Sequence, residues 1–312
     1  MRLLRSVLFP AFLLALAGIA AAQLTPEERA AAVIANNFEV TPNIVYGVAN
    51  NYQLKLDVYR PHKAKGPIPV VLVIHGGGWI NGSKEDRFLE GLPYMQMGFA
   101  VVNVEYRLAD VSLAPAAVED CLCALHWVAH NAQKYKFDLS KIVTSGGSAG
   151  GHLALTTGMI PSSAGLDTEC AADFNGWDAT PLVQLPKVAA IVNWFGIADV
   201  ADMLQGAPDT RSYAVAWLGS QPNREEIARR VSPVNYVRPG LPPIITIHGD
   251  DDKLVPHAQS VRLHQLLDKA GVRNQLLTIP GAGHGGFTDE QELKGYEAIK
   301  AFLTSVGIAP VK

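Results

Sequence analysis

Cysteine, charged residues and runs of one charge sign are all scarce in this sequence. Three cysteines in 312 residues are too few for a disulfide scaffold or a zinc ribbon. Charged residues make up 18% of the chain, the formal net charge is −3 and there is no basic block, so a nucleic-acid-binding surface is not expected. The 48% share of hydrophobic residues is typical of a globular protein and excludes disorder, collagen and coiled coil.

Residues 1–22 have the pattern of a secretory signal peptide. Arg2 and Arg5 supply a charged start, an apolar run spans 7–17, and small residues precede the expected cleavage site. The run is shorter than the roughly 20 residues that a membrane-spanning helix needs, and Pro10 interrupts it. We therefore expect cleavage rather than a stable membrane anchor, and a secreted or periplasmic protein in which disulfide bonds can form.

Two kinds of strand pattern follow. Residues 44–49 and 53–58 indicate an antiparallel hairpin, and in its second half apolar residues alternate with Lys55 and Asp57, which predicts a half-buried strand. Continuous apolar runs, typical of strands covered on both faces of a parallel sheet, occur at 69–74, 99–104, 142–144, 188–192 and 244–247.

Helical segments separate these strands. The clearest run from Pro115 to Ala132 and from Pro256 to Gly271. This order predicts an α/β protein with one mostly parallel sheet, helices on both faces and an antiparallel hairpin at the start. No repeat or linker divides residues 23–312, so we expect one domain, with an irregular insertion at about 160–186 serving as a lid or pocket wall.

The strongest chemical motif is Gly-Gly-Ser-Ala-Gly at 146–150, between a predicted strand and a predicted helix. A serine in such a tight turn has its hydroxyl exposed at a helix N-terminus, where a developing negative charge is stabilised. A phosphate-binding loop is the alternative, but the lysine of that motif is absent. We therefore predict that Ser148 is a nucleophile.

A serine hydroxyl needs donors for the oxyanion, a base and a group that orients the base. The sequence His-Gly-Gly-Gly-Trp at 75–79 follows a buried strand, and its backbone N–H groups can point at a substrate oxygen. Together with the N–H of Ala149, this loop is expected to form an oxyanion hole. A flexible turn is the alternative interpretation.

Three consecutive aspartates at 250–252 lie between a late strand and a helix. We predict that Asp252 orients the base, because its position places it in the loop at the end of the strand. Asp250 and Asp251 are expected to be solvated or to cap the helix. A calcium loop is disfavoured, since the alternating ligand spacing and the distal glutamate are missing.

His284 is the expected base, because it lies in a glycine-rich loop after the last predicted strand. His257, at the start of a helix, is the rival candidate. His126 and His130 share a helical face, but the glutamate of a zinc protease is missing and no third ligand is evident, so we expect no metal and no cofactor.

These residues give the chain a family resemblance. It resembles the carboxylesterases of the hormone-sensitive-lipase group and, within them, bacterial feruloyl and acetyl-xylan esterase-like proteins. The resemblance rests on the motifs at 75–79 and 146–150, on Asp252 and His284, and on shorter matches at 56–59, 105–108 and 231–233. It implies an α/β-hydrolase fold, a triad of Ser148, Asp252 and His284, and oxyanion donors at Gly77, Gly78 and Ala149.

The expected function is hydrolysis of short-chain or aromatic esters, free or linked to a polysaccharide, through an acyl-enzyme. Trp79, Trp194 and Phe287 are expected to line the substrate pocket, with core packing as the alternative. An amide hydrolase of the same fold is the alternative function, because Trp79 after the glycines also resembles the kynurenine formamidases. Cys170 in the insertion could pair with either Cys121 or Cys123.

Overall fold

The structure is a computed structural model that describes residues 25–171 and 186–309. The chain divides into two compact units, residues 1–36 and residues 37–312. Helix α1 (Pro26–Asn37) accounts for the described part of the first unit. All the other described elements belong to the second unit.

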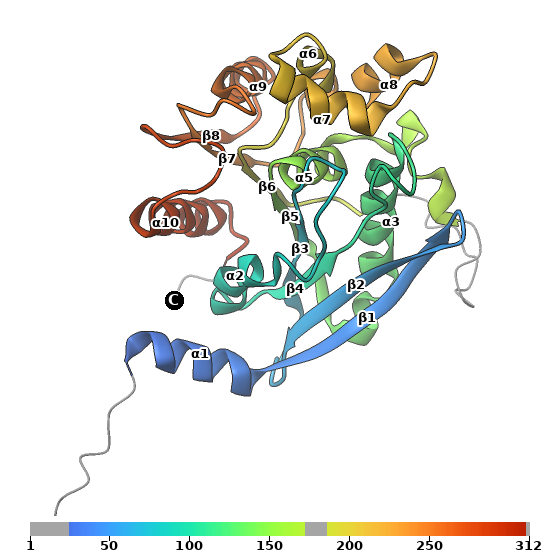
Figure 1. Cartoon of the computed structure of the whole chain (residues 1–312). Coiled ribbons are helices and arrows are strands. Elements are labelled where there is room, and N and C mark those ends of the chain that lie inside the picture. The colour runs from blue at the N-terminus through green and yellow to red at the C-terminus, as the bar shows by residue number, and fades with distance from the viewer. Residues whose placement is uncertain (1–24, 172–185, 310–312) are drawn as a thin grey trace, which may run out of the picture. The chain divides into compact units, whose positions relative to one another are not determined.

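One mixed sheet forms the centre of the second unit. Its eight described strands lie in the order β1-β2-β4-β3-β5-β6-β7-β8 (Figure 1). Strand β2 pairs antiparallel with β1 and with β4, and the six strands β4-β3-β5-β6-β7-β8 are parallel to one another. The strands are β1 (Phe38–Ala49), β2 (Tyr52–Pro61), β3 (Ile68–Ile74), β4 (Ala100–Val104), β5 (Phe137–Gly147), β6 (Ala190–Trp194), β7 (Ile244–Gly249) and β8 (Asn274–Ile279).

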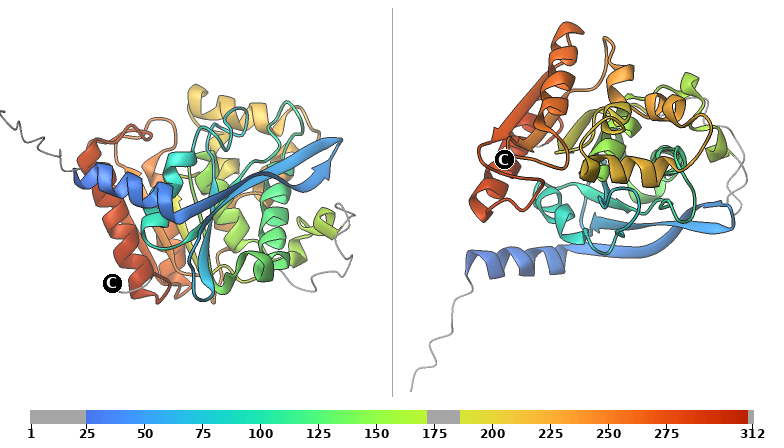
Figure 2. Two further views of the ribbon diagram at one scale, coloured as in Figure 1. Left: turned by 90° about the horizontal axis from the view of Figure 1, so that it is seen from below. Right: turned by 45° about the horizontal axis from the view of Figure 1, so that its top comes forward.

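Helices cover both faces of this sheet, with α2 and α10 on one face and α3, α5 and α9 on the other (Figure 1 and Figure 2). The longer helices are α3 (Ala116–His130), α5 (Ala149–Met159), α7 (Pro208–Leu218), α9 (His257–Lys269) and α10 (Asp289–Ser305). The shorter helical turns are η1 (Phe88–Gly91), α2 (Leu92–Gln96), α4 (Ala132–Tyr135), η2 (Ser162–Ala164), η3 (Thr168–Ala171), α6 (Val200–Met203), α8 (Arg224–Arg230) and η4 (Pro233–Tyr236). The predicted α/β architecture with its initial hairpin is confirmed.

The apolar character of the central strands follows from this double cover. Every residue of β4 and β7 is buried, because helices pack on both faces of the sheet. Strand β5 is longer than its apolar run, since its start pairs with β3 through Phe137 and Ile68. No helix within residues 25–171 and 186–309 is long and apolar enough to span a membrane.

Strand β2 departs from the predicted half-buried pattern at Asp57. Asp57 is buried, because Lys84 folds over it and places Nζ 3.0 Å from both carboxylate oxygens. The backbone N–H of Asn43 donates to the same carboxylate at 2.7 Å. The prediction of an exposed polar face is therefore wrong at Asp57, where an ion pair replaces solvent.

A disulfide ties the start of the irregular segment to the helical layer. Cys170 is bonded to Cys123 of α3, with 4.9 Å between their Cα atoms, whereas Cys121 is a buried free thiol. This resolves the pairing that the sequence left open. Most of the predicted lid-like insertion, residues 172–185, lies outside the described residues.

Candidate active site

Ser148 lies in the turn between β5 and α5 with a left-handed backbone, φ +56° and ψ −122°. Such a conformation is strained for a residue with a side chain, and it is held here by the Ser148 N–H, which donates to the Trp194 carbonyl at 2.9 Å. The flanking glycines are needed for close packing: a Cβ on Gly146 or Gly150 would lie 2.4 Å or 2.1 Å from the Ile74 carbonyl oxygen. The turn has the geometry of a nucleophile elbow.

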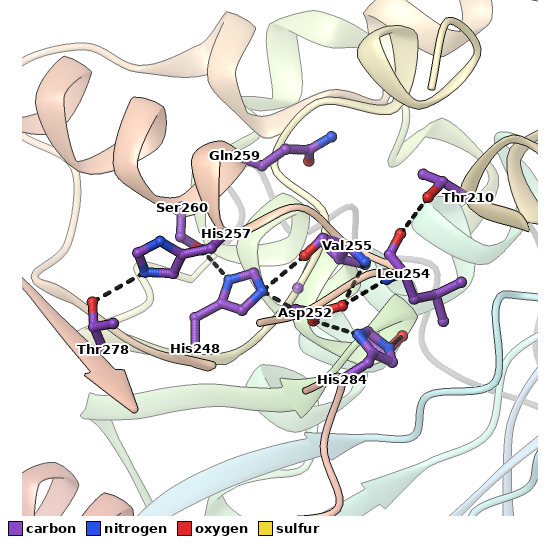
Figure 3. Close-up of polar contacts among 12 residues, drawn as sticks. Thr210, His248, Asp252, Leu254, Val255, His257, Gln259, Ser260, Thr278 and His284 are labelled. Atoms are coloured by element: carbon purple, nitrogen blue, oxygen red, sulfur yellow. Dashed lines mark hydrogen bonds and ion pairs between the residues drawn. The ribbon is translucent and has the colours of Figure 1, made fainter. Parts of the chain in front are cut away.

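A continuous chain of contacts runs from Ser148 through His284 to Asp252. His284 Nε2 lies 2.7 Å from Ser148 Oγ, and His284 Nδ1 lies 2.7 Å from Asp252 Oδ2. Asp252 follows β7 and His284 follows β8, so the carboxyl ends of neighbouring parallel strands bring the two side chains together (Figure 3). The structure therefore brings together the three residues selected from the sequence.

The surroundings of Asp252 keep its carboxylate ionised. Burial raises its pKa, but hydrogen bonds from His248, His284 and the backbone of Val255 outweigh burial and hold the pKa well below its usual range. Its Oδ1 accepts hydrogen bonds from the N–H groups of Leu254 and Val255, both at 2.8 Å. Because an ionised carboxylate only accepts hydrogen bonds, His284 Nδ1 carries the hydrogen and Nε2 faces Ser148 with its lone pair.

The nearby alternatives to these residues are engaged elsewhere. His257 Nε2 lies 3.0 Å from Thr278 Oγ1, so the rival base is held by β8 (Figure 3). Asp250 accepts a hydrogen bond from the Gly281 N–H at 2.6 Å, and Asp251 is exposed and pairs with Lys253. Of the three consecutive aspartates, only Asp252 contacts His284.

His248, the last residue but one of β7, has no role predicted from the sequence. Its side chain is completely buried, and its Nε2 lies 3.1 Å from Asp252 Oδ2, the same oxygen that contacts His284. The sequence does contain a signal for this contact, because His248 lies at the end of a buried strand and precedes Asp252 by four residues.

The loop after β3 brings backbone donors to the serine. Gly77 and Gly78 have φ values of +112° and +61°, a conformation that favours glycine. Within the described residues, the N–H groups of Gly77, Gly78 and Ala149 have no hydrogen-bond acceptor. The loop is fixed from behind, because the Gly77 carbonyl accepts hydrogen bonds from the N–H groups of Ile80 and Asn81 at 3.1 Å. Gly77 and Gly78 line the same cavity as Ser148.

A cavity of about 480 Å³ opens over Ser148 and His284. Its lining includes the apolar side chains of Ile197, Met203, Leu254 and Val255 and the ring of Tyr213. Its lining also includes charged and aromatic side chains, those of Arg87, Glu90, Tyr94, Trp194, Phe195, Phe287, Glu292 and Tyr296.

The three aromatic residues predicted for the pocket have different roles. Trp194 and Phe287 line the cavity and pack together, with their ring centroids 6.1 Å apart. Trp79 also borders the cavity, but its side chain is completely buried and its ring stacks on Trp217 at 4.3 Å. Its indole N–H donates to His152 Nδ1 at 3.2 Å, so the ring of Trp79 belongs to the core.

The cavity wall also comes from segments that the sequence did not indicate. Residues from η1 and α2, and from α6 and α7, line the cavity. The described residues of the predicted insertion, 160–171 and 186, do not line it. No group of three or more potential metal ligands occurs among residues 25–171 and 186–309.

The known proteins that this chain resembles are consistent with an esterase site. The model of the family described as BD-FAE matches residues 56–267, more than half of the chain. The chain belongs to the BD-FAE family. This membership confirms the esterase-group resemblance and the α/β-hydrolase fold.

Several solved and curated relatives of this BD-FAE chain are named esterases, whereas the non-reducing polyketide synthase pkbA of Emericella nidulans is 28% identical over 83% of this chain and only 14% of its own length. A truncated carbohydrate esterase from gut microbiota is 28% identical with a TM-score of 0.70, covering 86% of this chain and 96% of its own. Propionate-bound esterase 2 of Thermogutta terrifontis is 28% identical with a TM-score of 0.71, covering 89% and 97%, and has also been solved phosphorylated by paraoxon.

Among curated sequences, Esterase LipC of Mycobacterium tuberculosis is 29% identical over 74% of this chain. The match covers 56% of LipC. This BD-FAE chain thus spans little more than half of that relative's length.

Proposed function

We propose that the chain is a serine carboxylesterase in which Ser148 is the nucleophile, His284 the general base and Asp252 the residue that orients the base. The observation that carries this proposal is the pair of 2.7 Å contacts that His284 makes with Ser148 Oγ and Asp252 Oδ2. Family membership and the esterase names of the relatives support it.

Acylation begins when Ser148 Oγ attacks the ester carbonyl carbon and its proton passes to His284 Nε2. The carbonyl oxygen then carries the negative charge, and the N–H groups of Gly77, Gly78 and Ala149 stabilise it as an oxyanion hole. His284 gives its proton to the alkoxide as the C–O bond breaks, so the alcohol leaves neutral. Asp252 stabilises the imidazolium that forms between these two transfers.

Deacylation repeats the sequence with water as the nucleophile. His284 Nε2 removes a proton from water, the hydroxide attacks the acyl carbon, and the proton returns to Ser148 Oγ as the acid leaves. No cofactor takes part in either half of the proposed reaction.

The proposed substrates are short-chain or aromatic esters, either free or attached to a polysaccharide. The polar and aromatic side chains in the cavity lining support a substrate with a phenolic or sugar group, because aromatic faces and polar side chains can both contact such a group. The relative described as a carbohydrate esterase supports an ester attached to a sugar, and the relative described as propionate-bound supports a short acyl chain.

Initial hydrolysis rates on p-nitrophenyl acetate, methyl ferulate and acetylated xylan test this proposal, with Ser148→Ala as the blank. Turnover of ferulate or xylan acetate above the blank supports the finer substrate class. Activity on p-nitrophenyl acetate alone supports a short-chain esterase. Hydrolysis of formamides or anilides with no ester hydrolysis contradicts the proposal and favours the amide hydrolase.

We also propose that the protein is exported. The proposal rests on the sequence of residues 1–22, which lie outside the described residues, and the disulfide between Cys123 and Cys170 supports an oxidising compartment. Expression of the full chain in a bacterial host, followed by N-terminal sequencing of the periplasmic fraction, tests it. Export with cleavage near residue 22 is expected, whereas an intact chain in the cytoplasm contradicts export.

A further inference from the structure

His248 lies behind the Ser148–His284–Asp252 chain and takes no step in the proposed reaction. It belongs to β7, its side chain has no exposed surface, and it contacts Asp252 (Figure 3). Four polar groups surround Asp252: the N–H groups of Leu254 and Val255 at Oδ1, and the rings of His248 and His284 at Oδ2.

The contacts of His248 define which ring nitrogen carries a hydrogen. Nε2 lies 3.1 Å from Asp252 Oδ2 and 3.0 Å from the Val255 carbonyl oxygen. Both partners are acceptors, so Nε2 must donate. Nδ1 lies 2.7 Å from Ser260 Oγ on α9, and the serine hydroxyl can donate to it. His248 therefore links α9 to the carboxylate through a ring whose polar atoms are all engaged.

We propose that His248 is a positioning residue, which fixes the carboxylate of Asp252 in the orientation that His284 requires. The two backbone donors fix Oδ1, and His248 fixes Oδ2. Without the His248 donor, the remaining partner of Oδ2 is His284, which lies in a loop with two glycines after it. A carboxylate fixed at Oδ1 alone can turn further about its Cβ–Cγ bond, so it would hold the imidazole less firmly in the position from which Nε2 accepts the serine proton.

This inference rests on the proposed function, and matched substitutions separate the contacts of His248. In His248→Asn, the side-chain amide overlays the Nδ1 side of the ring, so it faces Ser260 and does not reach Asp252. In His248→Gln, the amide nitrogen reaches the position of Nε2, so it can donate to Asp252. Both substituted side chains are polar, and glutamine is close to histidine in volume whereas asparagine is smaller.

The measured quantity is the rate constant for reaction with paraoxon, followed by release of p-nitrophenolate. Ser148 Oγ attacks phosphorus, p-nitrophenolate leaves and the serine proton passes to His284, so the rate reports activation of Ser148 whatever the natural ester is. We expect His248→Asn to lower the rate on the order of 10- to 100-fold, since a hydrogen bond to a charged group is lost. His248→Gln should restore the rate to within about fivefold of the wild type.

A double-mutant cycle with Asp252→Asn distinguishes an effect of His248 on the position of Asp252 from general structural damage. If His248 acts through Asp252, His248→Asn should change the rate by less than about threefold once Asp252 has been replaced. An equal loss in both backgrounds, or a His248→Asn enzyme as fast as the wild type, overturns the proposal. If His248→Asn does not fold by circular dichroism, His248→Met tests the same loss of the donor.

The same assay separates the two proposals. A wild-type protein that neither reacts with paraoxon nor hydrolyses p-nitrophenyl acetate overturns the proposed function and this inference with it. A reactive wild type with no effect of His248 overturns the inference alone.

Discussion

Tyr213 of α7 packs against the backbone of Gly78, so closely that a Cβ built on Gly78 would lie 2.1 Å from Tyr213 Cδ1. The wall of the cavity and the loop after β3 are thus in direct contact. Any side chain at position 78 must displace either the tyrosine or the loop, and Gly78 also has a positive φ of +61°.

Gly78→Ala is therefore expected to lower kcat, on the order of 10²- to 10³-fold, because the displaced loop loses an oxyanion donor. Steady-state hydrolysis of p-nitrophenyl acetate measures the effect. Adding Tyr213→Ala removes the clash but leaves the backbone strain, so the double variant should recover only part of the loss. A Gly78→Ala enzyme with wild-type kcat would show that this loop does not stabilise the oxyanion.

Replacement of Trp79 should affect stability, because its ring is buried against Trp217. Trp79→Ala is expected to lower the free energy of unfolding by about 3–5 kcal/mol. Urea denaturation measures this loss. Trp194→Phe is the comparison, since Trp194 lines the cavity and its replacement should change KM with a smaller change in stability. A Trp79→Ala protein as stable as the wild type contradicts the core assignment.

The lowered pKa of Asp252 predicts a pH-dependent contribution to stability. A carboxylate whose pKa is lower in the folded state than in the unfolded state stabilises the fold above the unfolded value of about 3.9 and loses this contribution as the pH falls further. The difference in unfolding free energy between the wild type and Asp252→Asn should therefore be largest near neutral pH and shrink below about pH 4.

Denaturant unfolding between pH 3 and 7 measures this difference. Asp251→Asn is the matched control, because Asp251 lies in the same loop but is exposed. A difference for Asp252→Asn that stays constant, or grows as the pH falls below 4, contradicts the stabilised carboxylate.

The disulfide predicts the number of reactive thiols. Under denaturing conditions the oxidised protein should show one free thiol, that of Cys121, and three after reduction. Cys123→Ser should also lower the free energy of unfolding by roughly 2–5 kcal/mol. Three thiols before reduction would rule out the pairing of Cys123 with Cys170.

The sequence was sufficient for the parts of the site that depend on local backbone geometry. Ser148 lies in a glycine-bounded turn between a strand and a helix, and Asp252 and His284 each follow a strand. Parallel strands direct such loops to one edge of the sheet, so chain order and turn chemistry predict that these residues converge.

The features that were missed depend on packing between distant segments. Trp79 has the same sequence context whether its ring faces substrate or the core, and only the position of Trp217 decides between them. Asp57 is buried because Lys84 covers it, a pairing across 27 residues that strand periodicity cannot reveal. The cavity wall formed by η1 and α7 is assembled in the same way, from segments with no motif of their own.

Covalent labelling with paraoxon tests the role of Ser148 most directly. The wild-type protein is incubated with paraoxon, and intact-mass measurement and peptide mapping are compared with the residual hydrolysis of p-nitrophenyl acetate. We expect one diethylphosphoryl group per chain, located on Ser148, with hydrolysis lost in proportion to labelling. Ser148→Ala should remain unlabelled, with kcat lower on the order of 10⁶-fold. Labelling at another residue, or full ester hydrolysis by Ser148→Ala, would contradict the assignment of Ser148 as the nucleophile.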